Sequence, residues 1–349
     1  MRSANFPSQP KFFMNRINRR TFLITSFGSL FIAAQQKTAT IMTVSGPVAA
    51  SNLGTALIHE HFLVDFIGAD KTNPNRWNRD AVLKKVLPYL LEAKAAGVAS
   101  VFDCTPAFLG RDVVLLQLLS KESGLRIVTN TGYYGAVDNK YLPPWAFTET
   151  AEGLAARWIR EATSGIEGTP VRPGFIKISV DAKEPLSALH QKLVKAAALT
   201  HLKTGLTICS HTGPAHSAFQ EIGLLKNEGV HPSAFVWVHA QSEKDKSTYT
   251  RAAKMGAWIS LDGIGWGNFD SYAASVIHMK KEKLLHRVLI SHDAGWYKPD
   301  EPDAKFQGFT NIFNELVPRL KEAGFTQTDF DQLLIKNPAA AMSMRVRKR

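Results

Sequence analysis

Short apolar runs alternate with longer amphipathic runs along most of this chain, and this alternation restricts the possible folds more than any other feature. Eight runs have the length and composition of strands: residues 56–63, 100–104, 126–131, 174–179, 206–211, 234–239, 257–262 and 288–293. The segments between them have helical patterns, and several end in a glycine suited to a helix C-terminus. Strands that alternate with helices favour a parallel sheet, and eight such units match an α/β fold of the closed (β/α)8 type, the TIM barrel.

A doubly wound open sheet is the alternative, but no Gly-x-Gly-x-x-Gly turn follows the first predicted strand. Residues 40–343 contain no internal repeat, low-complexity tract or linker, so we expect a single domain there. Residues 326–343 are expected to form a closing helix with a turn at Asn337 and Pro338, and residues 344–349 a basic tail.

The excess of positive charge lies mostly at the two ends of the chain. The formal net charge is +12, and nine of these charges come from residues before position 21 and after position 344. The body between them is only weakly basic. We therefore expect no nucleic-acid partner, because a groove that follows phosphates needs a basic patch on the folded domain.

The first 34 residues have the layout of an export signal. Arg19 and Arg20 precede Thr-Phe-Leu and an apolar stretch that ends at Ala34, an order that resembles the twin-arginine type. A basic arm is the alternative. We expect cleavage near Ala34 and a periplasmic or exported mature protein.

The two cysteines, Cys104 and Cys209, end apolar runs and are expected to be buried free thiols.

Ionisable side chains gather at the C-terminal ends of the predicted strands, which is where the active site of a (β/α)8 barrel lies. Each one alone is more simply explained as a hydrogen-bonded core residue, but their common position indicates a site. They are His59, His61, Asp103, Lys177, His211, His239, Asp262 and Asp293.

These residue types suit a metal centre. Imidazoles and carboxylates bind divalent ions such as zinc, cobalt or manganese, and six ligand positions are too many for one tetrahedral ion but sufficient for two. Lys177 is unusual, because lysine is almost never fully buried unless it is paired. It can join the site only with a deprotonated amine, or after carbon dioxide converts the amine to a carbamate. Two ions would lower the pKa of a bound water molecule, which yields a hydroxide nucleophile, and would polarise an oxygen of the substrate.

The chain resembles the phosphotriesterase-like family of the amidohydrolase superfamily, close to its lactonase branch. The resemblance runs in order along nearly the whole chain and is carried by TVSGPV at residues 43–48, HEHF, GRDVVLLQLL, TGYY, GFIKI, SHTGPAH, NEGVHP, VHAQSEKD, SLD, ISHD and NPAAAMS.

The resemblance implies two divalent ions, with Zn²⁺ expected first and Co²⁺, Mn²⁺ or Fe as alternatives. The implied ligands are His59, His61 and Asp293 for the more buried ion, His211 and His239 for the more exposed one, and a carboxylated Lys177 that bridges both. The resemblance gives Asp293 and Lys177 the catalytic roles, since Asp293 would accept the proton of the bridging hydroxide.

Aromatic residues are expected to form the substrate pocket. The resemblance places Tyr134 beside the substrate, and Trp266 and Trp296 fall in predicted loops at the mouth of the barrel. The chain departs from the family pattern at Ser242, where an aspartate is common, and at Gly263, where histidine or arginine is common.

The expected function is that of a dinuclear metal-dependent hydrolase in which a metal-bridging hydroxide cleaves a lactone or carboxylic ester. A phosphotriesterase is the alternative, and a metal-binding barrel without turnover is the alternative of another class.

Glu60 is not expected to act as a base, because side chains alternate along a strand and Glu60 points away from His59 and His61. The expected partners are a small-molecule ester or lactone substrate and the export machinery, and a homodimer is compatible with the sequence.

Overall fold

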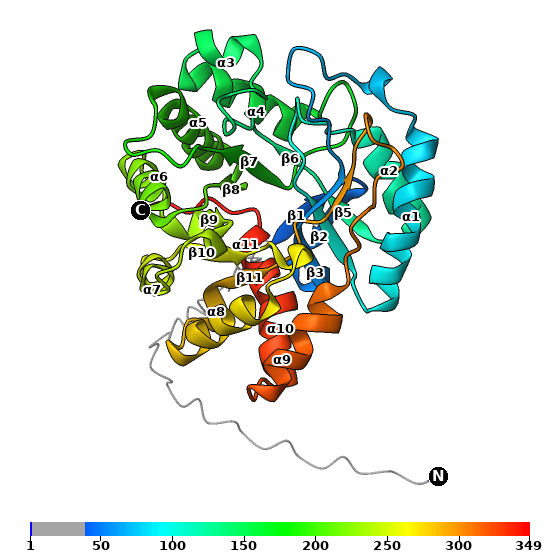
Figure 1. Cartoon of the computed structure of the whole chain (residues 1–349), viewed down its shortest axis with the longest axis vertical. Coiled ribbons are helices and arrows are strands. Elements are labelled where there is room, and N and C mark those ends of the chain that lie inside the picture. The colour runs from blue at the N-terminus through cyan, green and yellow to red at the C-terminus, as the bar shows by residue number, and fades with distance from the viewer. Residues whose placement is uncertain (2–38) are drawn as a thin grey trace. The chain divides into compact units, whose positions relative to one another are not determined.

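Parallel strands form a closed ring at the centre of the computed structural model, which describes residue 1 and residues 39–349 (Figure 1). The ring confirms the predicted barrel. The predicted export signal lies outside the described residues apart from residue 1. In order around the ring, the strands are β3 (Ala56–Leu63), β4 (Ser100–Asp103), β5 (Arg126–Val128) with β6 (Asn130–Thr131), β7 (Phe175–Ser179), β8 (Thr207–His211), β9 (Phe235–Val238), β10 (Trp258–Leu261) and β11 (Val288–Ile290) with β12 (Gly295–Tyr297).

Strand β12 closes the ring against β3, and the sequence had placed it in a loop. The two strands pair in parallel, with Gly295 opposite His61. Asp293 N donates to His59 O at 3.0 Å and His61 N donates to Ala294 O at 2.8 Å, so the same contact joins the first and last strands of the site. Gly295 has φ +103°, and a Cβ there would clash with the carbonyl of His61. Only glycine lets the two backbones approach this closely.

Helices cover the outside of the ring, as Figure 1 shows. Side chains of Asn78, Asp112, Thr150 and Ser187 accept hydrogen bonds from the first turns of four of them, which satisfies backbone donors that have no partner inside the helix. The α-helices of this part are α1 (Arg79–Ala95), α2 (Val113–Ser123), α3 (Pro144–Thr148), α4 (Ala151–Ser164), α5 (Ala188–Thr204), α6 (Ala215–Asn227), α7 (Ser247–Lys254) and α8 (Phe269–Lys281). Short 3₁₀ turns lie at Ala50–Asn52, Pro74–Arg76, Pro232–Ala234, Ala240–Ser242, Ile264–Trp266 and Leu285–Arg287.

The C-terminal helices corrected one prediction. After a π-helical turn (Ile312–Leu316) come α9 (Val317–Glu322), α10 (Gln327–Asp331), a second π-helical turn (Gln332–Lys336) and α11 (Asn337–Met342). The turn predicted at Asn337 and Pro338 is wrong, because both residues lie inside this helical run. Asn337 is buried and its Nδ2 donates to Leu285 O at 2.8 Å and to Val288 O at 2.6 Å. The π-helical turn just before Pro338 accommodates its missing N–H.

The barrel interior is a small apolar core that is closed at its base. The hairpin of β1 (Thr40–Thr43) and β2 (Gly46–Ala49) contributes Ile41, and α11 contributes Ala341 and Met342. They pack with inward-facing strand residues, among them Cys104 and Cys209, which are buried free thiols. Because the base is closed in this way, only the C-terminal ends of the strands remain open for a site.

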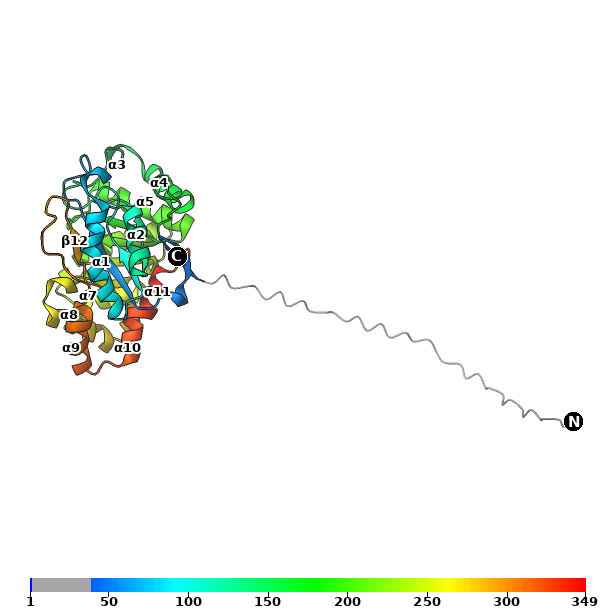
Figure 2. The same cartoon turned by 90° about the vertical axis from the view of Figure 1, so that its right-hand side faces the viewer.

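One basic residue of the C-terminal tail, Arg347, packs against the barrel, whereas Arg345, Lys348 and Arg349 are exposed. Arg347 is 6% exposed and donates hydrogen bonds to Ala341 O at 2.9 Å and Ser343 O at 3.1 Å. Figure 2 shows α11 beside this end of the chain. Among the residues that the structure describes, no helix is long and apolar enough to cross a membrane.

Candidate metal centre

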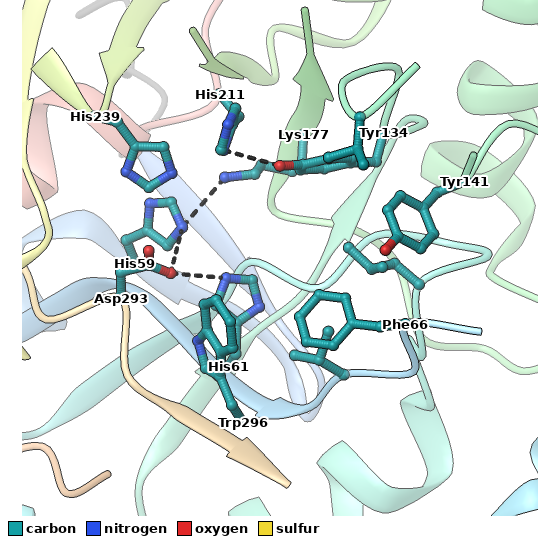
Figure 3. Close-up of a pocket in the computed structure, with 13 residues that line it drawn as sticks. His59, His61, Phe66, Tyr134, Tyr141, Lys177, His211, His239, Asp293 and Trp296 are labelled. Carbon is teal, nitrogen blue, oxygen red and sulfur yellow. Dashed lines mark hydrogen bonds and ion pairs between the residues drawn. The ribbon is translucent and has the colours of Figure 1, made fainter. Parts of the chain in front are cut away.

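A cavity of about 100 Å³ lies at the C-terminal ends of the barrel strands (Figure 3). Its lining brings together all six predicted metal ligands: His59, His61, Lys177, His211, His239 and Asp293. The remaining lining residues are apolar or aromatic: Val64, Phe66, Leu109, Tyr134, Val137, Tyr141 and Trp296.

An irregularity in β3 determines which of its side chains enter the cavity. Ala56 and Ile58 belong to the core inside the barrel, whereas Leu57 belongs to the layer between strands and helices. Strict alternation would therefore turn His59 and His61 outward. The pairing with β4 shifts register between Leu57 and Glu60, and such a shift reverses the faces. Both histidines consequently line the cavity, and Glu60 does not.

The donor atoms are spaced as the ligands of an ion. Asp293 Oδ1 lies 3.2 Å from His61 Nε2 and 3.6 Å from His59 Nε2. His59, His239 and Asp293 each offer an atom within 4.8 Å of the others. Two ligands about 2.1 Å from a tetrahedral Zn²⁺ ion would be about 3.4 Å apart. The side chains present therefore fit a divalent ion.

In His61 and His239, a hydrogen bond donated by Nδ1 leaves the Nε2 lone pair free for a metal. The Thr105 hydroxyl can give its proton to Leu63 O at 3.0 Å, and His61 Nδ1, 2.8 Å from Thr105 Oγ1, can then donate to it. His239 Nδ1 donates to Asp262 Oδ1 at 2.7 Å. An imidazole protonated at Nδ1 presents a lone pair at Nε2, and in both rings this nitrogen is left for the cavity.

Asp262 is a positioning residue that sequence reasoning left without a role. It is fully buried, and its second oxygen lies 3.3 Å from His59 Nδ1. One carboxylate thus holds His239 by a hydrogen bond and lies beside a second candidate ligand, His59. Its place directly after strand β10 was visible in the sequence, but the contact with two different histidines was not.

The pKa shifts of His59, His211 and Asp293 suit metal binding. Burial, reinforced by the nearby Lys177, lowers the pKa of His59 to about 3. Burial likewise lowers the pKa of His211 well below its usual value. Burial opposes ionisation of Asp293, but the neighbouring imidazoles hold its pKa below the usual value. Neutral imidazoles and an ionised carboxylate are the forms that bind a metal ion.

Lys177 is the unusual member of the cluster. Its side chain is fully buried in the middle of β7, and Nζ lies 3.3 Å from His59 Nε2. Within residues 39–349 this is the only hydrogen bond of the amine, and no carboxylate forms an ion pair with it. Lysine is almost never fully buried unless it is paired, so an amine buried here without a carboxylate is unusual.

Glu60 holds the segment that carries Asp293. Its Oε1 accepts from Ser291 Oγ at 2.7 Å, His292 N at 3.0 Å and His292 Nδ1 at 2.8 Å, and its Oε2 accepts from Ala294 N at 3.1 Å. These bonds bracket Asp293, whose backbone has φ +51°, a conformation that is uncommon for residues other than glycine. Glu60 therefore acts through Asp293 and does not face the cavity.

Two of the three predicted pocket aromatics line the cavity. Tyr134 OH lies 3.1 Å from His211 Nδ1, and the ring of Trp296 stands edge-on to His61 with centroids 5.9 Å apart. Trp266, the third, is 58% exposed and is not part of the lining. It packs against Trp296 and its Nε1 donates to Asp293 O at 2.8 Å. It supports the site from outside because the 3₁₀ turn Ile264–Trp266 carries it past the mouth.

Sequence reasoning missed Phe66 and Tyr141 in the cavity wall. Phe66 packs against Trp296 at 5.4 Å and against Tyr141 at 6.3 Å between ring centroids. Phe66 follows β3 so closely that its place at the mouth could have been inferred. Nothing in the sequence around Tyr141 indicates its position, which depends on the path of the loop after β6.

The two departures from the family pattern have different surroundings. At Gly263 an added Cβ would clash with the hydroxyl of Tyr272 and lie 2.9 Å from Gln241 Nε2. The space that a larger side chain would need is thus occupied by neighbours. Ser242 ends the 3₁₀ turn that follows His239, where its N–H donates to His239 O at 3.0 Å.

Comparison with known proteins gives consistent matches. The model of the family described as "Phosphotriesterase family" matches residues 39–342. A phosphotriesterase homology protein of Escherichia coli is 26% identical, over 82% of this chain and 97% of that protein. An aryldialkylphosphatase of Saccharolobus solfataricus is 27% identical, over 83% and 95%. An N-acetyltaurine hydrolase of Xenopus tropicalis is 24% identical, over 85% and 96%.

Proposed function

The chain belongs to the phosphotriesterase family, and from this membership we propose that it is a hydrolase that uses two divalent metal ions to cleave a neutral lactone or carboxylic ester. The observation that carries the proposal is the arrangement of donors around one cavity. Four imidazoles, one of them with its Nδ1–H fixed on Asp262, a carboxylate and a buried lysine amine meet there.

Each residue has a distinct task in this proposal. His59, His61 and Asp293 would hold one ion, and His211 and His239 the other. When bound, the ions would lower the pKa of a water molecule and polarise the substrate's carbonyl oxygen. Asp293 accepts the proton of the attacking water, for which its ionised state and its 16% exposed side chain are suitable.

We further propose that Lys177 carries a carboxylate added by carbon dioxide. The support is the burial of its amine beside His59 with no carboxylate paired to it. Carboxylation replaces a costly buried cation with an anion, which can be shared by two ions.

The lining favours a neutral substrate. Among the described lining residues there is no arginine, and Lys177 is the one side chain of cationic type beside the imidazoles. The N-acetyltaurine in the name of the Xenopus relative carries a sulfonate, and this wall offers no arginine to pair with it. A phosphotriester is the second candidate, because it is neutral and an aryldialkylphosphatase is among the relatives.

We also propose that the mature protein is exported and periplasmic. The support is the order Arg19-Arg20-Thr-Phe-Leu followed by an apolar stretch. Replacing both arginines by lysine should retain the protein in the cytoplasm, as cell fractionation would show. Unchanged export of that variant would contradict a twin-arginine route.

The hydrolase is tested by metal analysis together with a panel of lactones, carboxylic esters and phosphotriesters. We expect two ions per chain and the highest kcat/KM on a lactone or ester. The Lys177→Ala variant should lose metal and activity and regain part of both with a small added carboxylate. Full activity in that variant would refute the shared lysine, and bound metal without any hydrolysis would favour a barrel that binds metal without turnover.

A further inference from the structure

Residues 135–139, which we call the rim, form the side of the cavity mouth that follows β6. Three consecutive residues of the rim have left-handed backbone: Val137 with φ +62°, Asp138 with φ +51° and Asn139 with φ +65°. Asparagine and aspartate tolerate this conformation, but a β-branched residue such as valine rarely adopts it. Such strain persists only where the surrounding structure enforces it, and it concentrates at functional sites.

Hydrogen bonds from neighbouring elements enforce the conformation of the rim. Ala136 N donates to Ser179 Oγ at 2.7 Å, and Val137 N donates to Asp181 Oδ1 at 2.8 Å. Ser179 ends β7 and Asp181 follows it, so the strand that carries Lys177 also fixes the rim.

A buried histidine fixes the rim from the helical layer. His190 in α5 is 1% exposed, and its Nε2 lies 3.0 Å both from Gly135 O and from Asn139 Oδ1. Its Nδ1 accepts from Asp181 N at 3.3 Å. Since Nδ1 is an acceptor there, Nε2 carries the proton and serves the two oxygens of the rim. One neutral imidazole thus joins the rim to the segment after β7.

The result of these contacts is an apolar group held at the mouth of the cavity. Val137 lines the cavity and is nevertheless 54% exposed. Beyond it the surface is charged, because Asp138 pairs with Lys183 at 3.3 Å. An apolar part of a ligand that extends out of the cavity would therefore cover Val137 and would stop at this ion pair.

We propose that Val137 is a specificity-determining residue that contacts an apolar tail of the substrate, and that Asp181 is its positioning residue. The inference rests on the proposed function for the scissile group, but it concerns the part of the substrate furthest from the candidate metal ligands. The preferred substrates are then esters or lactones with an alkyl tail long enough to leave the cavity of about 100 Å³ and lie on the rim.

The first test compares Val137→Ala with Val114→Ala, each as the metal-loaded full chain. Val114 is a matched control, because it is a valine that is 39% exposed on α2 and does not line the cavity. For lactones with tails of increasing length, Val137→Ala should lower kcat/KM about 3- to 10-fold more for long tails than for the tail-free lactone. Contacts of this size in apolar pockets change specificity by about tenfold or more, and Val137 is half exposed. Val114→Ala should leave the length dependence unchanged.

The second test concerns Asp181. Asp181→Ala removes the acceptor of Val137 N–H and should reduce the preference for long tails as Val137→Ala does. Asp181→Asn keeps an oxygen at that position and should restore the preference. A general loss of folding would instead lower kcat/KM equally for all tail lengths in both variants.

A binding experiment separates this inference from the proposed function. Cyclic ketones with the same alkyl tails lack a cleavable bond, and calorimetry with the metal-loaded protein would measure their Kd. If no ester or lactone is hydrolysed but Kd falls with tail length only when Val137 is present, the proposed function fails and the inference holds. If neither hydrolysis nor binding depends on tail length, or if both valine variants behave alike, the inference is overturned.

Discussion

The buried carboxylate of Glu60 provides the sharpest test of how this barrel organises its site. In Glu60→Gln the side chain keeps its volume but has only one acceptor oxygen. If that oxygen faces Ser291 and His292, the new amide NH₂ faces Ala294 N–H, which now donates at 3.1 Å to Oε2. Losing a hydrogen bond to a charged group costs about 1.5–3 kcal/mol, and a buried donor without an acceptor costs about 1–3 kcal/mol. We therefore expect Glu60→Gln to lower the free energy of unfolding by about 3 kcal/mol or more.

The substitution should also affect the site, because Glu60 brackets Asp293. Displacement of Asp293 Oδ1 from its position 3.2 Å from His61 Nε2 removes a candidate ligand from its partners. Urea unfolding gives the change in stability, and titration with a chelator gives the change in metal affinity. We expect both to fall, with kcat reduced more than KM is changed, since the substrate-facing wall is not altered.

A surface glutamate is the matched control for this substitution. Glu152 is 61% exposed and pairs with Lys195 at 3.0 Å, and an exposed pair of this kind contributes little to stability. Glu152→Gln should therefore leave stability and metal affinity nearly unchanged. If Glu60→Gln behaves like Glu152→Gln in both measurements, the proposed role of Glu60 is refuted.

Three further substitutions test other parts of the structure. Asp262→Asn should weaken metal binding about 10- to 100-fold in a chelator titration, because it removes the charge that orients two imidazoles; unchanged affinity would contradict this. Val137→Gly should relieve about 1 kcal/mol of left-handed strain and raise the apparent Tm by about 2 °C, whereas Val114→Gly, inside a helix, should lower it. Burial raises the pKa of Glu221 from 4.5 to about 8, so the folded state binds its proton more tightly and stability should fall as pH rises through this range. In the wild type this fall can reach about 1.4 kcal/mol per pH unit, and Glu221→Gln should remove it. Urea unfolding of both proteins at pH 5 and pH 8 measures the change. An equal loss of stability between these pH values in both proteins would contradict the role of Glu221.

The strands were readable from the sequence because each is a short apolar run bounded by polar turns. All eight predicted runs contain strands, and the first has the predicted bounds, Ala56–Leu63. The differences lie at strand ends, where pairing partners decide the outcome. The third run divides into β5 and β6 at Thr129, and the eighth ends at Ile290 before the chain pairs again as β12. The run itself contains no information about which neighbour will be within hydrogen-bonding distance.

The candidate ligands were also readable, for a reason that topology supplies. In a parallel barrel all strands point the same way, so polar residues that follow apolar runs must meet at one end. The order of apolar runs and polar residues in the sequence was therefore enough to place His59, Lys177 and Asp293 around one cavity. It did not place Trp266, because the 3₁₀ turn that carries this side chain outward has no strand periodicity from which its direction follows.

What the sequence determined by itself is the set of chemical groups and the end of the barrel at which they gather. Only the tertiary structure decided how those groups are oriented. The register shift in β3 turns His59 and His61 inward, and Asp262 fixes His59 and His239 together. Glu60 bonds to His292, which lies 232 positions away along the chain. Orientation depends on contacts of this range, which form only when the barrel closes, whereas local periodicity reports just the few residues on either side.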